Sequence, residues 1–162
     1  GGGIVVDHGW HGIYVILEWL MRRPTAVEAV LETRRFHELC VEDTADVHIE
    51  AGEARARMFL TWAGDERKNA ARIEGTDGVI EMLDDHVLIS TSAGTERVDF
   101  ESALSGGSSH PDWFDATADD FFAEVEDPTR RGRNLQAAED CFRVIAAAQA
   151  SAAAGAVERL GG

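Results

Sequence analysis

The spacing of apolar residues changes along the chain from helical to alternating and back to helical. Apolar residues recur at helical spacing from about Asp7 to Met21, and Pro24 follows where that helix would end. Apolar and polar residues then alternate in short stretches from Ala26 to Phe100, as in half-buried strands. Helical spacing returns in two stretches after Pro111. This order predicts an α+β fold, a mostly antiparallel open-faced sheet with helices packed on one face.

The clearest predicted hairpin spans residues 44–62. Both halves of this stretch alternate, and a two-residue turn is predicted at Ala51-Gly52. That register predicts two compensating charge pairs across the strands, Asp46 with Arg57 and His48 with Arg55. The paired charges favour a sheet face that is in contact with water.

The remaining stretches predict a meander and two late helices. Further strands are expected over residues 26–34, 67–74, 79–83, 86–91 and 96–100. A helix from Pro111 to about residue 126 is expected to bury an apolar stripe, namely Phe114, Ala118, Phe121, Phe122 and Val125. A second helix is expected from about Leu135 to Gly155, with Cys141 and Phe142 among its buried residues, before a short last strand near residues 157–160.

The amino-acid composition limits the kinds of molecule that we expect the protein to bind. Acidic residues outnumber basic ones by 30 to 15, which gives a formal net charge of −15. Binding to nucleic acid or to an anionic membrane needs a basic patch, so we expect neither partner. The two cysteines, Cys40 and Cys141, are far apart and favour reduced thiols in a cytoplasmic protein. No apolar run approaches the ~20 residues that a membrane span needs.

The opening stretch carries the strongest candidate chemistry. Asp7 and His11 stand four residues apart, so a helix would place them on one face within reach of each other. A carboxylate beside an imidazole fixes its tautomer and favours its protonated form, as an acid/base group acting near neutral pH requires. The same spacing also fits a plain helix cap, Asp7, followed by an ordinary histidine.

Other candidates in the sequence are weaker. His8, His11 and Asp7 have metal-ligand side chains, but no further ligand stands at a recognised spacing, so we expect no metal site. Residues 108–110, Ser-Ser-His, fit the entry loop of a helix better than a catalytic serine, because adjacent residues rarely reach triad geometry. Trp10 and His110 are the residues that we expect to line a substrate pocket.

Three motifs together resemble one family. The chain opens with Gly-Gly-Gly, then Asp7, Gly9 and His11, followed by an apolar helix; its middle carries the turn Gly75-Thr76-Asp77-Gly78. It closes with Ser-Ala-Ala-Ala-Gly-Ala-Val-Glu-Arg-Leu over residues 151–160. In this order the motifs resemble the C-terminal domain of the Gfo/Idh/MocA oxidoreductases, the glucose–fructose oxidoreductase and inositol dehydrogenase family.

The resemblance implies roles for the opening residues. The family histidine that corresponds to His11 is the acid/base acting on the substrate hydroxyl, and the aspartate that corresponds to Asp7 orients it. The chain departs from the pattern at Tyr14, where family members often have an acidic residue that contacts the polyol. The family's Glu-Lys-Pro motif has no counterpart, because the only lysine is Lys68.

The expected function is therefore that of part of an enzyme. No G-x-G-x-x-G follows a strand, so residues 1–162 are expected to form a single C-terminal substrate-binding, catalytic and oligomerisation domain without the N-terminal Rossmann domain. That missing domain would bind NAD or NADP, and this fragment alone should be inactive. We expect a dehydrogenase acting on a sugar, inositol or related polyol, and a homo-oligomer formed through the open sheet face. The alternative is a non-enzymatic sheet module for self-association or partner binding.

Overall fold

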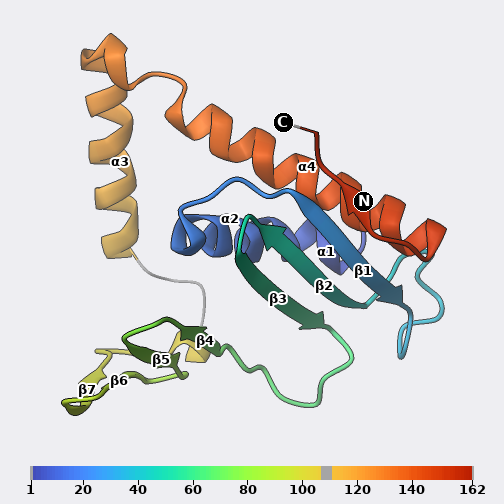
Figure 1. Ribbon diagram of the computed structural model, residues 1–162, viewed down its shortest axis with the longest axis horizontal. Helices are drawn as coiled ribbons and strands as arrows, with labels where there is room; N and C mark the ends of the chain where they lie inside the picture. Colours follow the sequence, from blue (N-terminus) through green and yellow to red (C-terminus); the bar gives the residue numbers. More distant parts are fainter. Residues whose placement is uncertain (1, 107–110, 162) are drawn as a thin grey trace. The chain divides into compact units, whose positions relative to one another are not determined.

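The computed structural model describes residues 2–106 and 111–161, and it divides into two compact units. One unit comprises Gly1–Gly64 and Phe122–Gly162, and the other comprises Asp65–Phe121. Each unit has its own four-stranded antiparallel sheet (Figure 1). The predicted α+β class and antiparallel pairing are confirmed, although the strands form two sheets.

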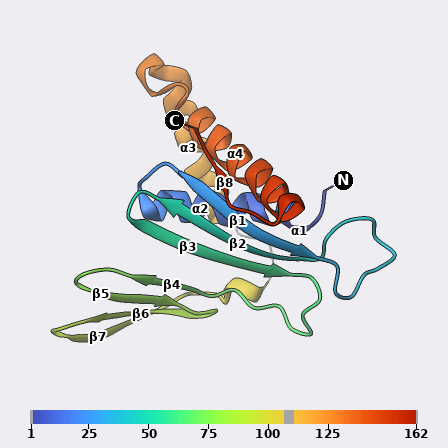
Figure 2. The same cartoon turned by 45° about the vertical axis from the view of Figure 1, so that its right-hand side comes forward.

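The sheet of the first unit has the order β3-β2-β1-β8. Its strands are β1 (Ala26–Glu32), β2 (Thr44–Ala51), β3 (Ala54–Thr61) and the two-residue β8 (Glu158–Arg159). Figure 2 shows β8 beside β1, so the end of the chain closes one edge of this sheet. As alternation predicts, Val27 and Val47 are buried on one face while Glu28 and His48 are exposed on the other.

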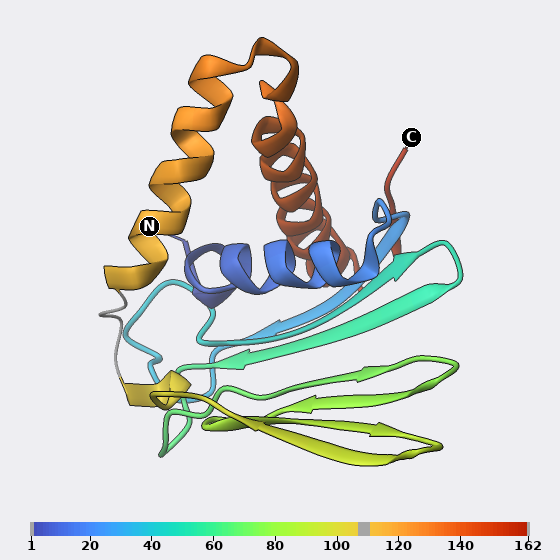
Figure 3. The ribbon, with the colours of Figure 1, turned by 90° about the vertical axis from the view of Figure 1, so that its left-hand side faces the viewer.

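Three helices cover the buried face of that sheet. They are α1 (Ile4–Asp7), α2 (Gly9–Leu20) and α4 (Arg133–Ala154), and Figure 3 shows α2 and α4 on the same side of the strands. The core combines apolar residues of the helices and the strands, including Ile4, Val5, Ile13, Val27, Val47, Ile49, Met58, Val144 and Ala148. Among the described residues, no helix combines the length and the apolarity needed to cross a membrane.

The hairpin turn lies one residue later than predicted. Ala51 pairs with Ala54, so the turn is Gly52-Glu53, and Gly52 has the positive φ of 64° that favours glycine. The register therefore shifts by two: Arg57 lies opposite His48, and Arg55 lies opposite Glu50. The predicted register was wrong because alternation assigns residues to faces without locating the turn.

The second unit contains the predicted meander. Its strands are β4 (Ala71–Glu74), β5 (Gly78–Met82), β6 (His86–Thr91) and β7 (Gly94–Asp99), paired in chain order. The short helix η1 (Leu104–Gly106) follows, and Asp84 holds it by accepting hydrogen bonds from the N–H and hydroxyl groups of Ser105.

The predicted burial of the late aromatic residues was wrong. The helix α3 (Pro111–Glu126) leads to η2 (Pro128–Arg130), but Phe114 is 72% exposed and Phe122 is 59% exposed. Helical spacing shows that such residues share a face, whereas burial needs a partner surface. On α4, Phe142 is also exposed, because Cys141, Val144, Ile145 and Ala148 form the buried stripe at helical spacing.

The closing motif has a clear structural role. Gly155 ends α4 in the left-handed conformation, with φ 64°. Four residues earlier, the buried Ser151 Oγ accepts a hydrogen bond from the backbone N–H of Ala29 at 3.0 Å. The serine and glycine of the motif thus attach α4 to β1 and turn the chain back toward the sheet.

The carboxylate of Asp43 organises the connection between β1 and β2. It is fully buried and accepts hydrogen bonds from the backbone N–H groups of Arg34, Arg35 and Phe36 and from the Thr44 hydroxyl. Burial opposes its ionisation, but these hydrogen bonds outweigh burial and hold the pKa of Asp43 well below its usual range. The ionised form is therefore the one that the fold stabilises.

We expect Asp43→Asn to lower Tm at pH 7 by roughly 5–10 °C, because an amide cannot accept all of these hydrogen bonds. A lowered native pKa gives stability that is complete above the unfolded value, about 3.9, and is lost on acidification. The Tm difference between wild type and variant should therefore shrink as the pH falls from about 5 to about 2. Thermal unfolding across this range measures it, with the exposed turn variant Glu53→Gln as control. An Asp43→Asn Tm equal to wild type at pH 7 would contradict the assignment.

Candidate functional site

His11 lies in the first turn of α2 with its side chain exposed. Across the described part of the chain, its imidazole has no hydrogen bond or ion pair to another side chain. The side chain is therefore accessible to a ligand from solvent.

Asp7, the other predicted catalytic residue, is the last residue of α1 and is also exposed. Its Oδ2 lies 3.0 Å from Nδ1 of His8, so the structure pairs Asp7 with His8 and shows no contact with His11 among the described residues. The helical path nevertheless continues through the junction, because His8 N–H donates to Ile4 O and Gly12 N–H donates to His8 O. Asp7 and His11 therefore lie on either side of this junction, Asp7 at the end of α1 and His11 in the first turn of α2.

The two predicted pocket residues have different outcomes. Trp10 is partly buried and packs against the hydrophobic core, so much of its ring serves the fold. His110 lies outside the described residues.

The orientation of α2 follows from a close approach to β3. A Cβ built on Gly12 would lie 2.6 Å from Sδ of Met58, so a side chain at this position would force the Met58 side chain to move. Gly9 and Ile13 are buried on the same side of α2, whereas His11 and Tyr14 are exposed. The helix can present His11 outward because its inner side carries glycines where the strand comes closest.

Glu42 supports the start of the site, and sequence reasoning missed it. Its backbone O accepts a hydrogen bond from Ile4 N at 3.0 Å, and its Oε1 accepts one from Val5 N at 3.2 Å. These two N–H groups at the start of α1 have no partners within the helix. A Cβ on Gly3 would overlap the Glu42 carboxylate, which explains why glycine suits this position. Glu42 is 37 positions from Val5, so no local pattern indicates the contact.

His8 has a second partner that the sequence does not suggest. Nε1 of Trp62, just after β3, donates a hydrogen bond to His8 Nδ1 at 3.1 Å. The two rings meet edge to face, with centroids 6.0 Å apart. Within the described residues, no group of metal-ligand side chains gathers around His8 or elsewhere.

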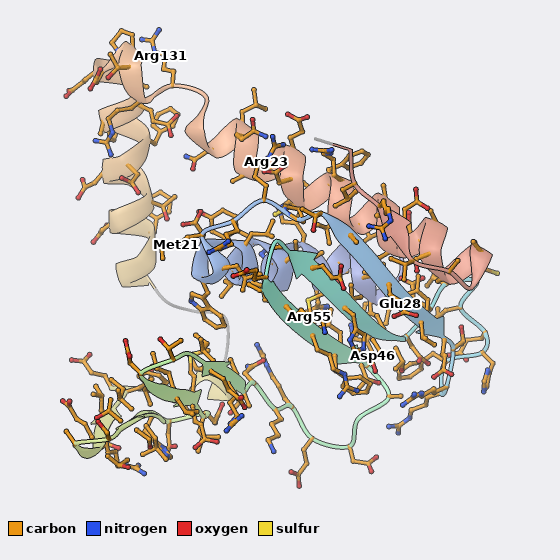
Figure 4. The ribbon with its side chains drawn as sticks, in the orientation of Figure 1. Met21, Arg23, Glu28, Asp46, Arg55 and Arg131 are labelled. Carbon is orange, nitrogen blue, oxygen red and sulfur yellow. The ribbon has the colours of Figure 1, made fainter. Side chains whose placement is uncertain are left out.

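A hollow of about 330 Å³ lies between α2 and α4, one turn beyond His11. Its wall includes Tyr14, Leu17, Met21, Arg23 and Asp140, and Figure 4 shows Met21 and Arg23 near the end of α2. Arg23 binds Asp140 with both Nη2–Oδ1, 2.8 Å, and Nε–Oδ2, 3.2 Å. Burial raises the pKa of the neighbouring Cys141 thiol, and the Asp140 charge adds to this effect. The thiol therefore stays protonated, consistent with the predicted free cysteine.

The outward face of the first sheet is charged but internally compensated. Arg57 binds Asp46 through two hydrogen bonds, at 2.8 and 2.7 Å, although the two residues are diagonal and not opposite. The hydrogen bonds and charge of Arg57 lower the pKa of Asp46. His48 Nε2 lies 3.3 Å from the same carboxylate, and Figure 4 shows Asp46, Arg55 and Glu28 across this region. The predicted partnership of Asp46 with Arg57 is confirmed.

Comparison with known proteins identifies the family. Residues 1–81, half of the 162-residue chain, match the family described as GFO/IDH/MocA C-terminal domain. The chain therefore belongs to this family, and the resemblance seen in its motifs is confirmed. No curated protein matches the chain significantly.

Solved structures share the fold. An oxidoreductase from Agrobacterium radiobacter, in complex with NAD+, L-tartaric acid and magnesium, has a TM-score of 0.77 and 19% identity over 96% of this chain and 48% of its own. A protein described as a myo-inositol dehydrogenase from Sinorhizobium meliloti 1021 has a TM-score of 0.75 and 14% identity, and the match covers 98% of this chain and 50% of that protein. GenD2 from gentamicin A biosynthesis, in complex with NAD, has a TM-score of 0.69 and 23% identity, and the match covers 100% of this chain and 49% of GenD2. The chain thus spans about half the length of these proteins.

The contact between Gly3 and Glu42 can be tested by substitution. We expect Gly3→Ala to cost about 0.5–1.5 kcal/mol, because the new methyl group displaces Glu42 and breaks its hydrogen bond to Val5. In a Glu42→Ala background the same substitution should cost almost nothing, since the displaced group is gone. Urea unfolding of the four variants measures this coupling. Gly75→Ala is the control, because the only atom near its Cβ is Gly78 O at 3.9 Å. Equal costs of Gly3→Ala in both backgrounds would contradict the contact.

Proposed function

We propose that this chain is the substrate-side, catalytic domain of an NAD(P)-dependent oxidoreductase that acts on a CH–OH group of a sugar, inositol or related polyol. The observation that carries the proposal is the exposure of both Asp7, at the end of α1, and His11, in the first turn of α2, at the start of a segment that matches the family. The substrate class rests on the proteins that share the fold: one is described as a myo-inositol dehydrogenase and another holds L-tartaric acid, both names of hydroxylated small molecules.

The described residues do not fit the dinucleotide by themselves. A pyrophosphate is typically held at a helix N-terminus that follows a glycine-rich turn. Here the glycine-rich opening does lead into α1, but Glu42 already accepts from the first N–H groups of that helix, with its backbone O from Ile4 N–H and with its carboxylate from Val5 N–H. A second anion at this position would be repelled. This supports our proposal that NAD or NADP binds to a domain outside this chain, and its nicotinamide would supply the hydride acceptor.

The residues of this chain accept and return the proton of the substrate hydroxyl. His11, in its neutral form, accepts the proton of the substrate hydroxyl as the carbinol carbon is oxidised, and returns it in the reverse direction. Asp7, one turn earlier, stabilises the imidazolium that forms and orients the ring. Trp10 and His110 remain candidates for lining the substrate pocket, and Tyr14, exposed one turn beyond His11, is a further polar group on the same side of α2.

Substitution in the full-length enzyme tests these roles. His11→Ala should lower kcat by about 10²–10⁴-fold, while its exposed position should limit the change in unfolding free energy to roughly 1 kcal/mol or less. Asp7→Asn should cause a smaller loss and change the pH profile, because it removes the charge that supports His11. Steady-state rates of nicotinamide reduction and thermal unfolding measure both effects, with the exposed loop histidine variant His37→Ala as control. Near wild-type turnover in His11→Ala would overturn the proposal.

The exposed face of the first sheet supports the proposal of a homo-oligomer. The same face would form the contact if the chain were instead a non-enzymatic module for self-association or partner binding. Val30 is 56% exposed and Phe59 is 48% exposed among the compensated charges of this face. Apolar side chains of this size are enriched where subunits meet. The face therefore suits a second copy of the chain.

We expect Val30→Glu to shift the full-length protein toward monomer, because it places a charge in the apolar part of that contact. Sedimentation across the micromolar range measures the change, with Leu39→Glu in the loop between β1 and β2 as control. A wild-type protein that is monomeric throughout this range would contradict the contact. Retained self-association without dehydrogenase activity would favour the alternative module.

A further inference from the structure

The hollow between α2 and α4 begins beside the proposed catalytic histidine. Its volume of about 330 Å³ is at the lower end of the range for pockets that bind small molecules, about 300–1,000 Å³. Tyr14 and Glu18 line it, and they stand three and seven positions after His11 on α2. Residues at this spacing share one face of a helix. The hollow therefore continues the face of α2 that carries His11.

The charges in the wall of the hollow cancel. Arg23 binds Asp140 through two hydrogen bonds, at 2.8 and 3.2 Å, and the Asp140 side chain is only 9% exposed. The two other charged residues of the wall, Glu18 and Arg22, have opposite signs. A charged ligand group would gain little from a wall with two charges of each sign. The hollow is therefore suited to an uncharged group.

The rest of the wall favours an aromatic ligand group. Apart from Gln136, it consists of Tyr14, Leu17, Met21, Ala137 and Cys141. Tyr14 is 41% exposed, so its ring is accessible from the hollow. Aromatic rings pack on one another in stacked or edge-to-face arrangements, and the sulfur of methionine makes favourable contacts with aromatic rings. An aromatic ring in the hollow would therefore find two specific partners, Tyr14 and Met21.

The backbone at Met21 is independent evidence that its side chain has a role. Met21 ends α2 in the left-handed conformation, with φ 48° and ψ 33°, and no other non-glycine residue in the described ranges has a positive φ. Glycine is usual at such helix ends because a Cβ is unfavourable there. Met21 is also 87% exposed, so its side chain adds almost nothing to the core. Strained residues of this kind are concentrated at binding sites.

We propose that this hollow binds the aromatic aglycone of a glycoside whose sugar ring lies at His11. The inference rests on the proposed function and narrows its substrate class from a sugar or polyol to an aryl glycoside. Along the axis of α2, Leu17 lies about 9 Å beyond His11, a distance that a sugar ring and one aromatic ring span together. The aromatic ring packs on Tyr14, and the Met21 thioether covers its edge. Neither residue takes part in proton transfer.

The first measurement follows the methionine ε-methyl groups by NMR in the full-length protein. The probes are phenyl β-D-glucopyranoside and methyl β-D-glucopyranoside, and the Met21 resonance is identified by its loss in Met21→Gly. This resonance should move with the phenyl glucoside alone, while the resonance of Met82 in the second unit stays in place. The phenyl glucoside should bind about tenfold more tightly than the methyl glucoside, because it buries an additional apolar ring.

Three results of this measurement would overturn the aglycone site. They are a Met21 resonance that neither glucoside moves, one that both glucosides move equally, and one that moves with protein concentration instead. The last result would show that a second copy of the chain covers the hollow.

The second measurement compares variants of the wall. Met21→Gly should raise Tm by about 1–3 °C, because it relieves the left-handed backbone, yet weaken binding of the phenyl glucoside about three- to tenfold. A merely structural role for Met21 would not produce these opposite effects. Ala137→Phe fills the hollow from α4 and should abolish the preference for the phenyl glucoside, with the exposed Ala153→Phe on the same helix as control. An unchanged affinity in either wall variant overturns the site.

Both measurements report binding without turnover, so their outcome is distinguishable from failure of the proposed function. An inactive His11→Ala together with an unmoved Met21 resonance rejects only the aglycone site. A Met21 resonance that moves with the phenyl glucoside while His11→Ala stays fully active supports the site and rejects only the proton-transfer assignment.

Discussion

The contact between the backbone of α2 and Met58 of β3 is the constraint on which the candidate site depends. At Gly12 the helix backbone lies so near the Met58 side chain that a methyl group there would require the Met58 sulfur to move. Because Gly9 and Ile13 are buried on the same side, the rotation of α2 about its axis is set by packing. His11 faces outward as a consequence of that rotation. The exposure of His11 thus depends on the glycines at positions 9 and 12 of the same helix, which carry no side chain.

Support from distant residues completes this arrangement. Glu42 occupies the N-terminus of α1, and the neighbouring Asp43 fixes the loop from which Glu42 projects. A charged carboxylate is stabilised both by the free N–H groups and by the helix dipole at such a position. The opening glycines therefore make room for a carboxylate of the protein itself. This differs from the use of glycine-rich turns to admit a phosphate.

The sequence predicted features that depend on neighbouring residues and failed for those that depend on distant ones. Alternation identified the faces of β1 to β3, and Gly155 correctly marked the end of α4, because both are local. Alternation did not locate the turn at Gly52-Glu53, and helical spacing did not reveal that Phe142 is exposed. Glu42 and Trp62 lie 37 and 54 positions from their partners, so their roles had no local pattern. The partnership of Asp7 with His11 stays a prediction.

The hydrogen bond from Ala29 to Ser151 has a consequence for how the first sheet can grow. β8 pairs with only Ala26 and Val27, so the following part of β1 would otherwise present an unused backbone donor. A bare strand edge of this kind is a template for aggregation by strand addition. The Ser151 hydroxyl accepts the hydrogen bond of this donor. Because Ser151 lies in a helix, it adds no new strand edge to the sheet. Beyond the point where β8 ends, this edge of β1 therefore offers one donor fewer to an added strand.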